Sequence, residues 1–312
     1  ITGFGLCHEC VVFLGYVNDI ELVNLYRNCY LFVFPSLHEG FGLKVRLLDP
    51  IGAAILDANL AEDVNVDSQA IACIERLMAE QGFVVFKSDK QLGVRDFLRV
   101  SCWWGGRVLH STHSVHPATP EGNPHVFRLS NDPLQGIMGV GPQWHNDGSF
   151  ITKTFSHAGY HMVRPAEKGG ATLFAHQARA FEALGSEKKE YWSRLSSVNA
   201  STGVVHPLVH QHPLLGRNAV WLHLGMTGAV IEKIAGEDAF RLLNEDQLIE
   251  LCHQYDDLLN FGLTGGYSIK YEYDANDCLF IDNLSVAHRA APEAHSSPEI
   301  QGLRIMLSLI HI

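Results

Sequence analysis

Apolar residues recur at helical spacing in three stretches of the chain. Between residues 67 and 81 they lie three or four positions apart, and Gly82 follows where a glycine commonly ends a helix. The same spacing predicts helices over about 90–102 and over 246–260. Short apolar runs bounded by turn residues predict strands at 83–86, 170–174, 219–224, 267–273 and 278–282.

Many short strands with helices at the margins predict a mainly β fold with flanking helices. The expected core is a double-stranded β-helix, the jelly-roll or cupin-like barrel. No Gly, Ser or Pro-rich linker and no repeat interrupts residues 49–306, so we expect one domain there. With 312 residues, 46% of them hydrophobic, the chain is long enough to bury a core of this size.

The charge distribution narrows the range of partners. Lys and Arg total 23 and Asp and Glu total 34, which gives a formal charge of -11. No run of basic residues could follow a phosphate backbone, so we do not expect nucleic acid as a partner. No apolar run reaches the length of about 20 residues that crossing a membrane requires, so none is expected to do so.

Seven cysteines are scattered along the chain. Their odd number and spacing argue against a disulfide framework and for a reducing compartment, so we expect a cytoplasmic protein. Because the sequence begins at Ile1, a preceding targeting segment stays open. Cys7 and Cys10 form one CxxC, which is either a metal or redox pair or two small buried hydrophobes.

The first candidate for chemistry is Trp144-His145-Asn146-Asp147, which follows a Gly-Val-Gly-Pro turn. Side chains two apart on a strand point to the same side, so His145 and Asp147 could share one metal ion. The alternative is a surface turn with a capping aspartate. The second candidate is His288, which follows a predicted strand and a turn and would lie on the opposite strand of the barrel.

Two imidazoles and one carboxylate leave coordination positions open, which is the ligand set of non-haem Fe(II) oxygenases. Arg304 offers a planar fork that can bind a carboxylate through two hydrogen bonds. Thr172 offers a hydroxyl to the same group. Taken singly, Arg304 could instead form a surface salt bridge, and Thr172 could be an ordinary strand residue.

Residues 1–48 differ from the rest. The stretch FLGYVNDIELVNLYRNCYLFVFPSLHEGFGLKV, residues 13–45, resembles part of the nucleotide-sugar domain of GT-B glycosyltransferases. Glu39 matches the first of two glutamates in that family, and the second falls at Leu47. A piece this small cannot bury enough surface to fold alone. We interpret residues 1–48 as a glycosyltransferase-like remnant and not as an independent domain.

Residues 49–306 resemble the taurine and 2,4-dichlorophenoxyacetate dioxygenase (TauD/TfdA) family, in the ordered motifs WHNDGSF, GGATLFAH, HPLVHQHPLLGRNAVWL, FIDNLSVAHRA and LRIM. The resemblance implies that His145, Asp147 and His288 bind Fe(II), and that Thr172 and Arg304 bind the distal carboxylate of 2-oxoglutarate. It also implies that O2 is consumed, that a small-molecule substrate is hydroxylated, and that succinate and CO2 are released. The resemblance does not decide whether the chain forms homo-oligomers.

Further residues have open roles. Asp282 and Asn283 could orient His288 or could simply form a turn. His110, His113 or Asn131 could line the substrate pocket. Most of the histidines that match no ligand position are expected on the surface or in loops; these are His110, His113, His116, His161, His176, His206, His210 and His212. The segment 307–312 is interpreted as a tail that need not be native, which leaves the comparison of Ser308 with the substrate-binding arginine of the taurine enzyme open.

Two rival functions remain beside the dioxygenase. One is a non-catalytic metal-binding jelly roll, which would retain metal without turning over 2-oxoglutarate. The other is a glycosyltransferase, which the missing cleft makes improbable.

Overall fold

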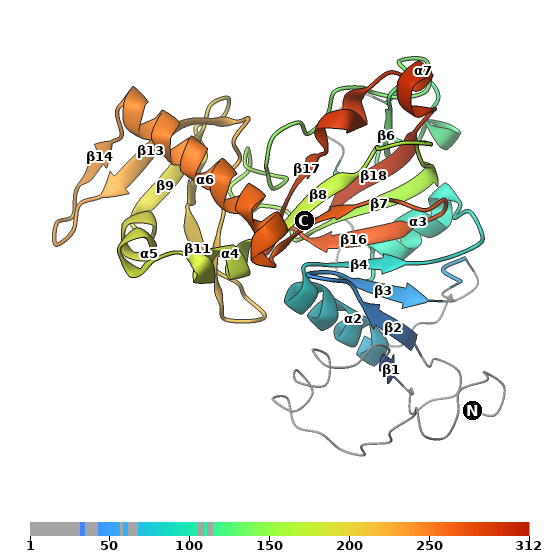
Figure 1. Cartoon of the computed structure of the whole chain (residues 1–312), viewed down its shortest axis with the longest axis horizontal. Coiled ribbons are helices and arrows are strands. Elements are labelled where there is room, and N and C mark those ends of the chain that lie inside the picture. The colour runs from blue at the N-terminus through green and yellow to red at the C-terminus, as the bar shows by residue number, and fades with distance from the viewer. Residues whose placement is uncertain are drawn as a thin grey trace.

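The computed structural model describes residues 32–34, 43–56, 59–61, 68–104, 109–110 and 115–311. In that part of the chain the largest sheet has nine strands, and Figure 1 shows it on the right. In spatial order these are β1 (Phe32–Phe34), β2 (Leu43–Leu47), β3 (Ala53–Leu56), β4 (Phe83–Phe86), β16 (Cys278–Asp282), β7 (His157–Arg164), β18 (Ile305–His311) and β5 (Leu109–His110), with β6 (Phe127–Ser130) paired to β18.

A smaller sheet faces this one. It consists of β15 (Ser268–Tyr271), β8 (Thr172–His176) and β17 (Val286–Ala290), all paired antiparallel. Side chains alternate between the faces of each strand. On β4, Phe83 and Val85 therefore pack against Phe174 of β8 between the sheets, while Val84 and Phe86 face the opposite side. The two facing sheets confirm the predicted jelly-roll core.

Helices cover the outer faces. On the large sheet lie α2 (Ser68–Gln81) and α3 (Val94–Ser101). On the far side of the small sheet lie α4 (Gln177–Ala183), α5 (Ser186–Trp192) and α6 (Glu245–Gly265), with a four-stranded sheet beside them (Figure 1). The strands of that sheet are, in spatial order, β10 (Val205–Pro207), β9 (Leu195–Asn199), β13 (Thr227–Lys233) and β14 (Phe240–Leu242). The other described elements are β11 (Val209–Gln211), β12 (Asn218–Val220), α7 (Pro298–Gln301) and the 3-10 turns Pro120–Gly122 and Pro292–His295.

The helix predictions hold with shifted ends. Gly82 ends α2 with φ +90° and donates its N–H to the carbonyl of Met78, as a C-terminal glycine does. The helix expected from residue 90 begins only at Val94. The helix expected to end at 260 continues to Gly265, because the left-handed residue that stops it is Gly266. Among the described residues, no helix is both long and apolar enough to cross a membrane.

The expectation that most of these histidines lie on the surface or in loops is wrong for His161, His176 and His206, which are buried on strands. His161, His176, His206 and His212 are each at most 9% exposed, and all but His212 lie on strands. Burial lowers the pKa of His161 to about 4 and that of His176 to about 3, so these imidazoles pack as neutral rings.

The two ends of the sequence contribute strands where the structure describes them. Most of residues 1–48, Glu39 included, lies outside the described residues. Leu47 pairs with Ala53, so β2 joins the edge of the large sheet. At the other end, residues 305–311 form β18 between β7 and β5, and Leu307 and Leu309 are buried in the core.

Candidate metal centre

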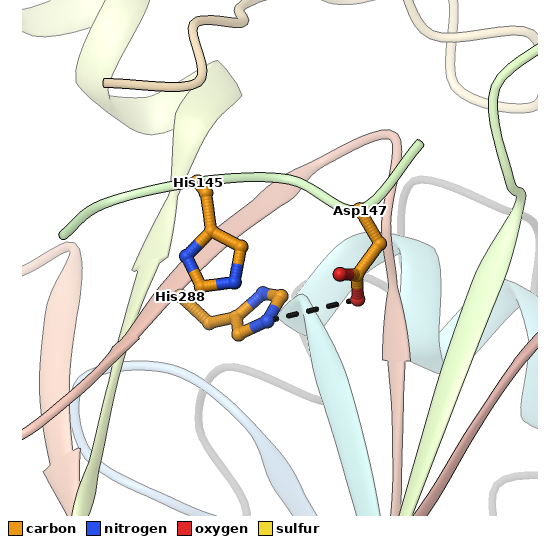
Figure 2. A group of neighbouring side chains, drawn as sticks. All are labelled: His145, Asp147 and His288. Atoms are coloured by element: carbon orange, nitrogen blue, oxygen red, sulfur yellow. Dashed lines mark ion pairs between the residues drawn. The ribbon is translucent and has the colours of Figure 1, made fainter. Parts of the chain in front are cut away.

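Three potential ligands converge between the two sheets. One ligand atom from each of His145, Asp147 and His288 lies within 4.8 Å of the other two, and Figure 2 shows the side chains turned toward one another. Nε2 of His288 is 3.7 Å from Oδ2 of Asp147, and the two imidazole centroids are 4.2 Å apart. Of the residues that the structure describes, these form the one such group of three.

A backbone pair brings the two histidines together. The N–H of His145 donates to the carbonyl of His288 at 3.0 Å, and the N–H of His288 donates back at 2.9 Å. The expectation that opposite strands supply the ligands is therefore wrong, because the two residues are direct neighbours. The strand expected at His145 and Asp147 is also reduced to this single bridge, and Asp147 lies in a turn.

Hydrogen bonds outside any regular strand fix the direction of Asp147. The Asn283 amide accepts from the N–H of Asp147 at 2.9 Å and donates to its carbonyl at 2.9 Å. It also donates to the carbonyl of Phe155 at 2.8 Å, and its side chain is fully buried. The proposed role for Asn283 needs correction, since it holds Asp147 and not His288. Asp282 instead accepts from Nε2 of His212 at 2.8 Å.

Asn146 points the opposite way from its neighbours and anchors the segment. Its amide nitrogen donates to the carbonyls of Asn283 and Val286 at 2.7 and 2.9 Å. It exchanges two further hydrogen bonds with the amide of Gln177. His145 and Asp147 are thus left on the pocket side, which is the arrangement that the two-residue spacing predicted.

Hydrogen bonding and burial act on the two imidazoles of the site. Nδ1 of His145 donates to the carbonyl of Gln143 at 2.7 Å, which leaves the lone pair of Nε2 directed at the site. Burial, followed by the neighbouring His145 and His223, holds the pKa of His288 well below its usual value. The same effects lower the pKa of His223, whose ring centroid is 5.1 Å from that of His145, to about 3.

A glycine turn leaves room for the His145 ring. A Cβ at Gly141, whose φ is +65°, would come within 2.9 Å of Cε1 of His145. Any larger residue there would both strain the turn and push the ring. The Gly-Val-Gly-Pro turn noted in the sequence therefore serves the site directly.

Thr172 and Arg304 line the same pocket as the three ligands. Arg304 is 7% exposed, and its backbone is held by Asn131 and Ser130. Nη1 donates weakly to the carbonyl of Gly170 at 3.4 Å, Nε has no hydrogen-bond partner, and no described carboxylate forms an ion pair with the side chain. A surface salt bridge is therefore not its role, and a buried cation without a counter-charge favours an anion beside it.

Sequence reasoning missed two tyrosines. Tyr273 donates its hydroxyl to Oγ1 of Thr172 at 3.0 Å, and Tyr160 donates to Nε2 of His288 at 2.9 Å. Neither belongs to a recognisable motif, and only the packing of β7 and the chain after β15 brings them here. Asn131, expected in the pocket, instead holds the backbone near Arg304; His113 and the side chain of His110 lie outside the described residues.

The rest of the pocket wall is largely apolar. It includes Phe127, Leu129, Ile137, Val140 and Met306, together with Ser308 of β18. A molecule bound beside the three ligands would contact this wall.

Comparisons with known proteins agree with this geometry. A family model described as "Taurine catabolism dioxygenase TauD, TfdA family" matches residues 44–306. An alpha-ketoglutarate-dependent sulfonate dioxygenase of Saccharomyces cerevisiae is 24% identical over 273 residues, which cover 80% of this chain and 62% of that protein. The crystal structure of a taurine dioxygenase from Burkholderia xenovorans superposes with a TM-score of 0.67 at 19% identity, over 91% of this chain and 89% of the other.

A second likeness is short. The serotype-specific mannosyltransferase WbdA of Escherichia coli is 39% identical over 83 residues, which cover 24% of this chain and 10% of the enzyme. The chain thus spans less than two thirds of the length of either curated relative.

Proposed function

Because the chain belongs to the taurine catabolism dioxygenase TauD, TfdA family, we propose that it is an Fe(II)- and 2-oxoglutarate-dependent dioxygenase that hydroxylates a small molecule. The observation that carries the proposal is the presence, in one pocket, of a two-histidine, one-carboxylate group and a buried arginine that has no counter-charge among the described residues. The two histidines and the carboxylate fit an iron with open coordination positions. The arginine fits the far carboxylate of a dicarboxylic co-substrate.

In this proposal His145, Asp147 and His288 hold the iron. Neutral imidazole nitrogens and a carboxylate oxygen are the donors that Fe(II) accepts. The two histidines are held by hydrogen bonds to backbone groups, and the backbone of Asp147 is held by the side-chain amide of Asn283. With 2-oxoglutarate and O2 bound, the iron supplies the oxidation that hydroxylates the substrate and yields succinate and CO2.

Thr172 and Arg304 bind and orient the co-substrate. The arginine fork gives two parallel hydrogen bonds to a carboxylate, and the Thr172 hydroxyl, itself accepting from Tyr273, can donate a third. The apolar residues Phe127, Ile137 and Met306 exclude water from the pocket and contact the primary substrate.

The test is formation of succinate from 2-oxoglutarate in air, with and without added Fe(II). We expect iron-dependent turnover in the wild type and none in Asp147→Ala. His253→Ala, an exposed histidine on α6, is the matched control and should retain turnover. Metal binding without turnover, across sulfonate, aryloxyacetate and betaine substrates, would favour the rival non-catalytic metal-binding jelly roll.

We interpret residues 1–48 as a glycosyltransferase-like remnant beside the dioxygenase domain, and the short likeness to a mannosyltransferase supports this. Deleting residues 1–42, which precede β2, should leave dioxygenase turnover intact. A loss of turnover in a folded deletion variant would assign this segment to the dioxygenase.

We place the protein in the cytoplasm. The free cysteines Cys102, Cys252 and Cys278 support a reducing compartment. Microscopy of a tagged chain tests this, and accumulation in an oxidising compartment would contradict it.

A further inference from the structure

The Tyr160 hydroxyl occupies the point where a metal ion is expected to bind His288. It donates to Nε2 of that histidine at 2.9 Å, and Tyr160 is 6% exposed and lines the pocket. Nε2 also lies 3.7 Å from Oδ2 of Asp147. This nitrogen has one lone pair, so it can accept the hydroxyl proton or bind a metal, but not both.

The two histidines differ in this respect. Nδ1 of His145 donates to the Gln143 carbonyl, and no donor among the described residues bonds to its Nε2. His288 has the opposite arrangement, since its Nδ1 has no hydrogen-bond partner in the described part of the chain and its Nε2 is bonded to Tyr160. Metal binding therefore costs a protein hydrogen bond at His288 and none at His145.

Tyr160 cannot move away when that bond is broken. It lies in the middle of β7, paired with Leu279 of β16 on one side and with Ser308 of β18 on the other. The phenol can only rotate its O–H toward another acceptor. A phenolic O–H remains a hydrogen-bond donor in its new position. A buried donor left without an acceptor would be costly.

Polar groups continue from Tyr160 along the pocket. Tyr273 donates its hydroxyl to Thr172, and Thr172 and Arg304 line the same pocket as Tyr160. A co-substrate that bridges the metal and Arg304 therefore passes the Tyr160 hydroxyl near its 2-oxo acid group. Oxygens of that group are strong acceptors for a phenolic donor.

We propose that Tyr160 is a co-substrate-binding residue whose hydroxyl exchanges partners, from Nε2 of His288 to the 2-oxo acid end of 2-oxoglutarate when a metal binds that nitrogen. The inference rests on the proposed function. It explains why a phenol, and not an apolar side chain, lies beside a metal-ligand nitrogen in the core of the large sheet.

The test uses Mn(II), which binds such a ligand set without starting oxidation, and two titrations under argon. The first measures the affinity for Mn(II) alone by electron paramagnetic resonance. The second measures the affinity of the Mn(II)-loaded protein for 2-oxoglutarate by calorimetry. Tyr160→Phe is compared with wild type and with Tyr271→Phe, a matched control whose buried hydroxyl bonds to Asp277 away from the pocket.

Tyr160→Phe should change the two affinities in opposite directions. Mn(II) should bind about twofold to tenfold more tightly, because no hydrogen bond has to be broken. The affinity for 2-oxoglutarate should fall about tenfold to 100-fold, because a hydrogen bond to a charged group is lost. Tyr271→Phe should change neither.

Unchanged affinity for 2-oxoglutarate in Tyr160→Phe, or weaker Mn(II) binding, would overturn the inference. Wild-type protein that binds neither Mn(II) nor 2-oxoglutarate would instead refute the proposed function itself. If the phenylalanine variant does not fold, Tyr160→Met removes the hydroxyl with a flexible apolar side chain, and the same pair of opposite changes is expected.

Discussion

The substitution Asn283→Ala separates the support of a metal ligand from the ligand itself. The Asn283 amide makes three hydrogen bonds, two to the backbone of Asp147 and one to that of Phe155, in a fully buried position. Removing it leaves three buried backbone groups without this partner. At about 1 kcal/mol for each, the free energy of unfolding should fall by about 3 kcal/mol.

The same change should weaken metal binding, although Asn283 is not a ligand. Without the amide, the Asp147 backbone is free to shift and its carboxylate loses its fixed direction. Loss of such supporting bonds typically costs about 10-fold to 100-fold in metal affinity. Urea unfolding of the metal-free protein and titration with Mn(II) measure the two effects separately.

Asn199→Ala is the matched control. Asn199 is also buried, and its side chain accepts from the backbone of Ser201 and Thr202 and donates to Ser149. It should lose comparable stability and keep its affinity for Mn(II). If Asn283→Ala loses stability but binds Mn(II) as wild type does, the positioning of Asp147 by Asn283 is refuted.

Three further predictions follow from the same geometry. Arg304→Lys keeps the positive charge and loses the planar fork of the guanidinium, so the affinity for 2-oxoglutarate should fall about tenfold to 100-fold. The affinity for Mn(II) in the absence of 2-oxoglutarate should not change. Calorimetry measures both affinities, and an equal loss in both would contradict the role assigned to Arg304. Tyr273→Phe removes the hydroxyl that donates to Thr172, so the affinity for 2-oxoglutarate should fall. Unlike Tyr160→Phe, it should not raise the affinity for Mn(II). Burial lowers the pKa of His176 to about 3, so below about pH 6.5 the unfolded chain takes up a proton at this residue and the folded protein does not. Lowering the pH from 7 to 5 should therefore reduce the free energy of unfolding by about 2 kcal/mol. Urea unfolding at pH 7 and at pH 5 should show a correspondingly smaller reduction in His176→Gln.

The sequence was sufficient where a local pattern determines the structure. The apolar spacing before Gly82 predicted α2, and the many short apolar runs separated by turns predicted a jelly roll, which the two facing sheets form. The pocket brings together His145, Asp147, His288, Thr172 and Arg304 as the motifs implied, because their order along the chain reflects the order of strands around a jelly roll.

The rest depends on contacts between distant segments. Tyr160 reaches His288 only through the register of β7 against β16 and β18, which no spacing in the sequence encodes. Asn283 was singled out, but the residue that it supports depends on how two turns meet. Most of the histidines outside the ligand motifs were expected on the surface or in loops. Burial of a neutral ring is possible where the backbone supplies a hydrogen bond, as Glu80 does for His176.

The most direct test of the central claim is anaerobic addition of Fe(II) and 2-oxoglutarate to the purified chain, followed by visible absorption. If His145, Asp147 and His288 hold the iron and Arg304 holds the co-substrate, a weak charge-transfer band should appear that needs both additions and is absent in His288→Ala. A folded wild-type protein without the band, or a band that persists in His288→Ala, would contradict the three-ligand site.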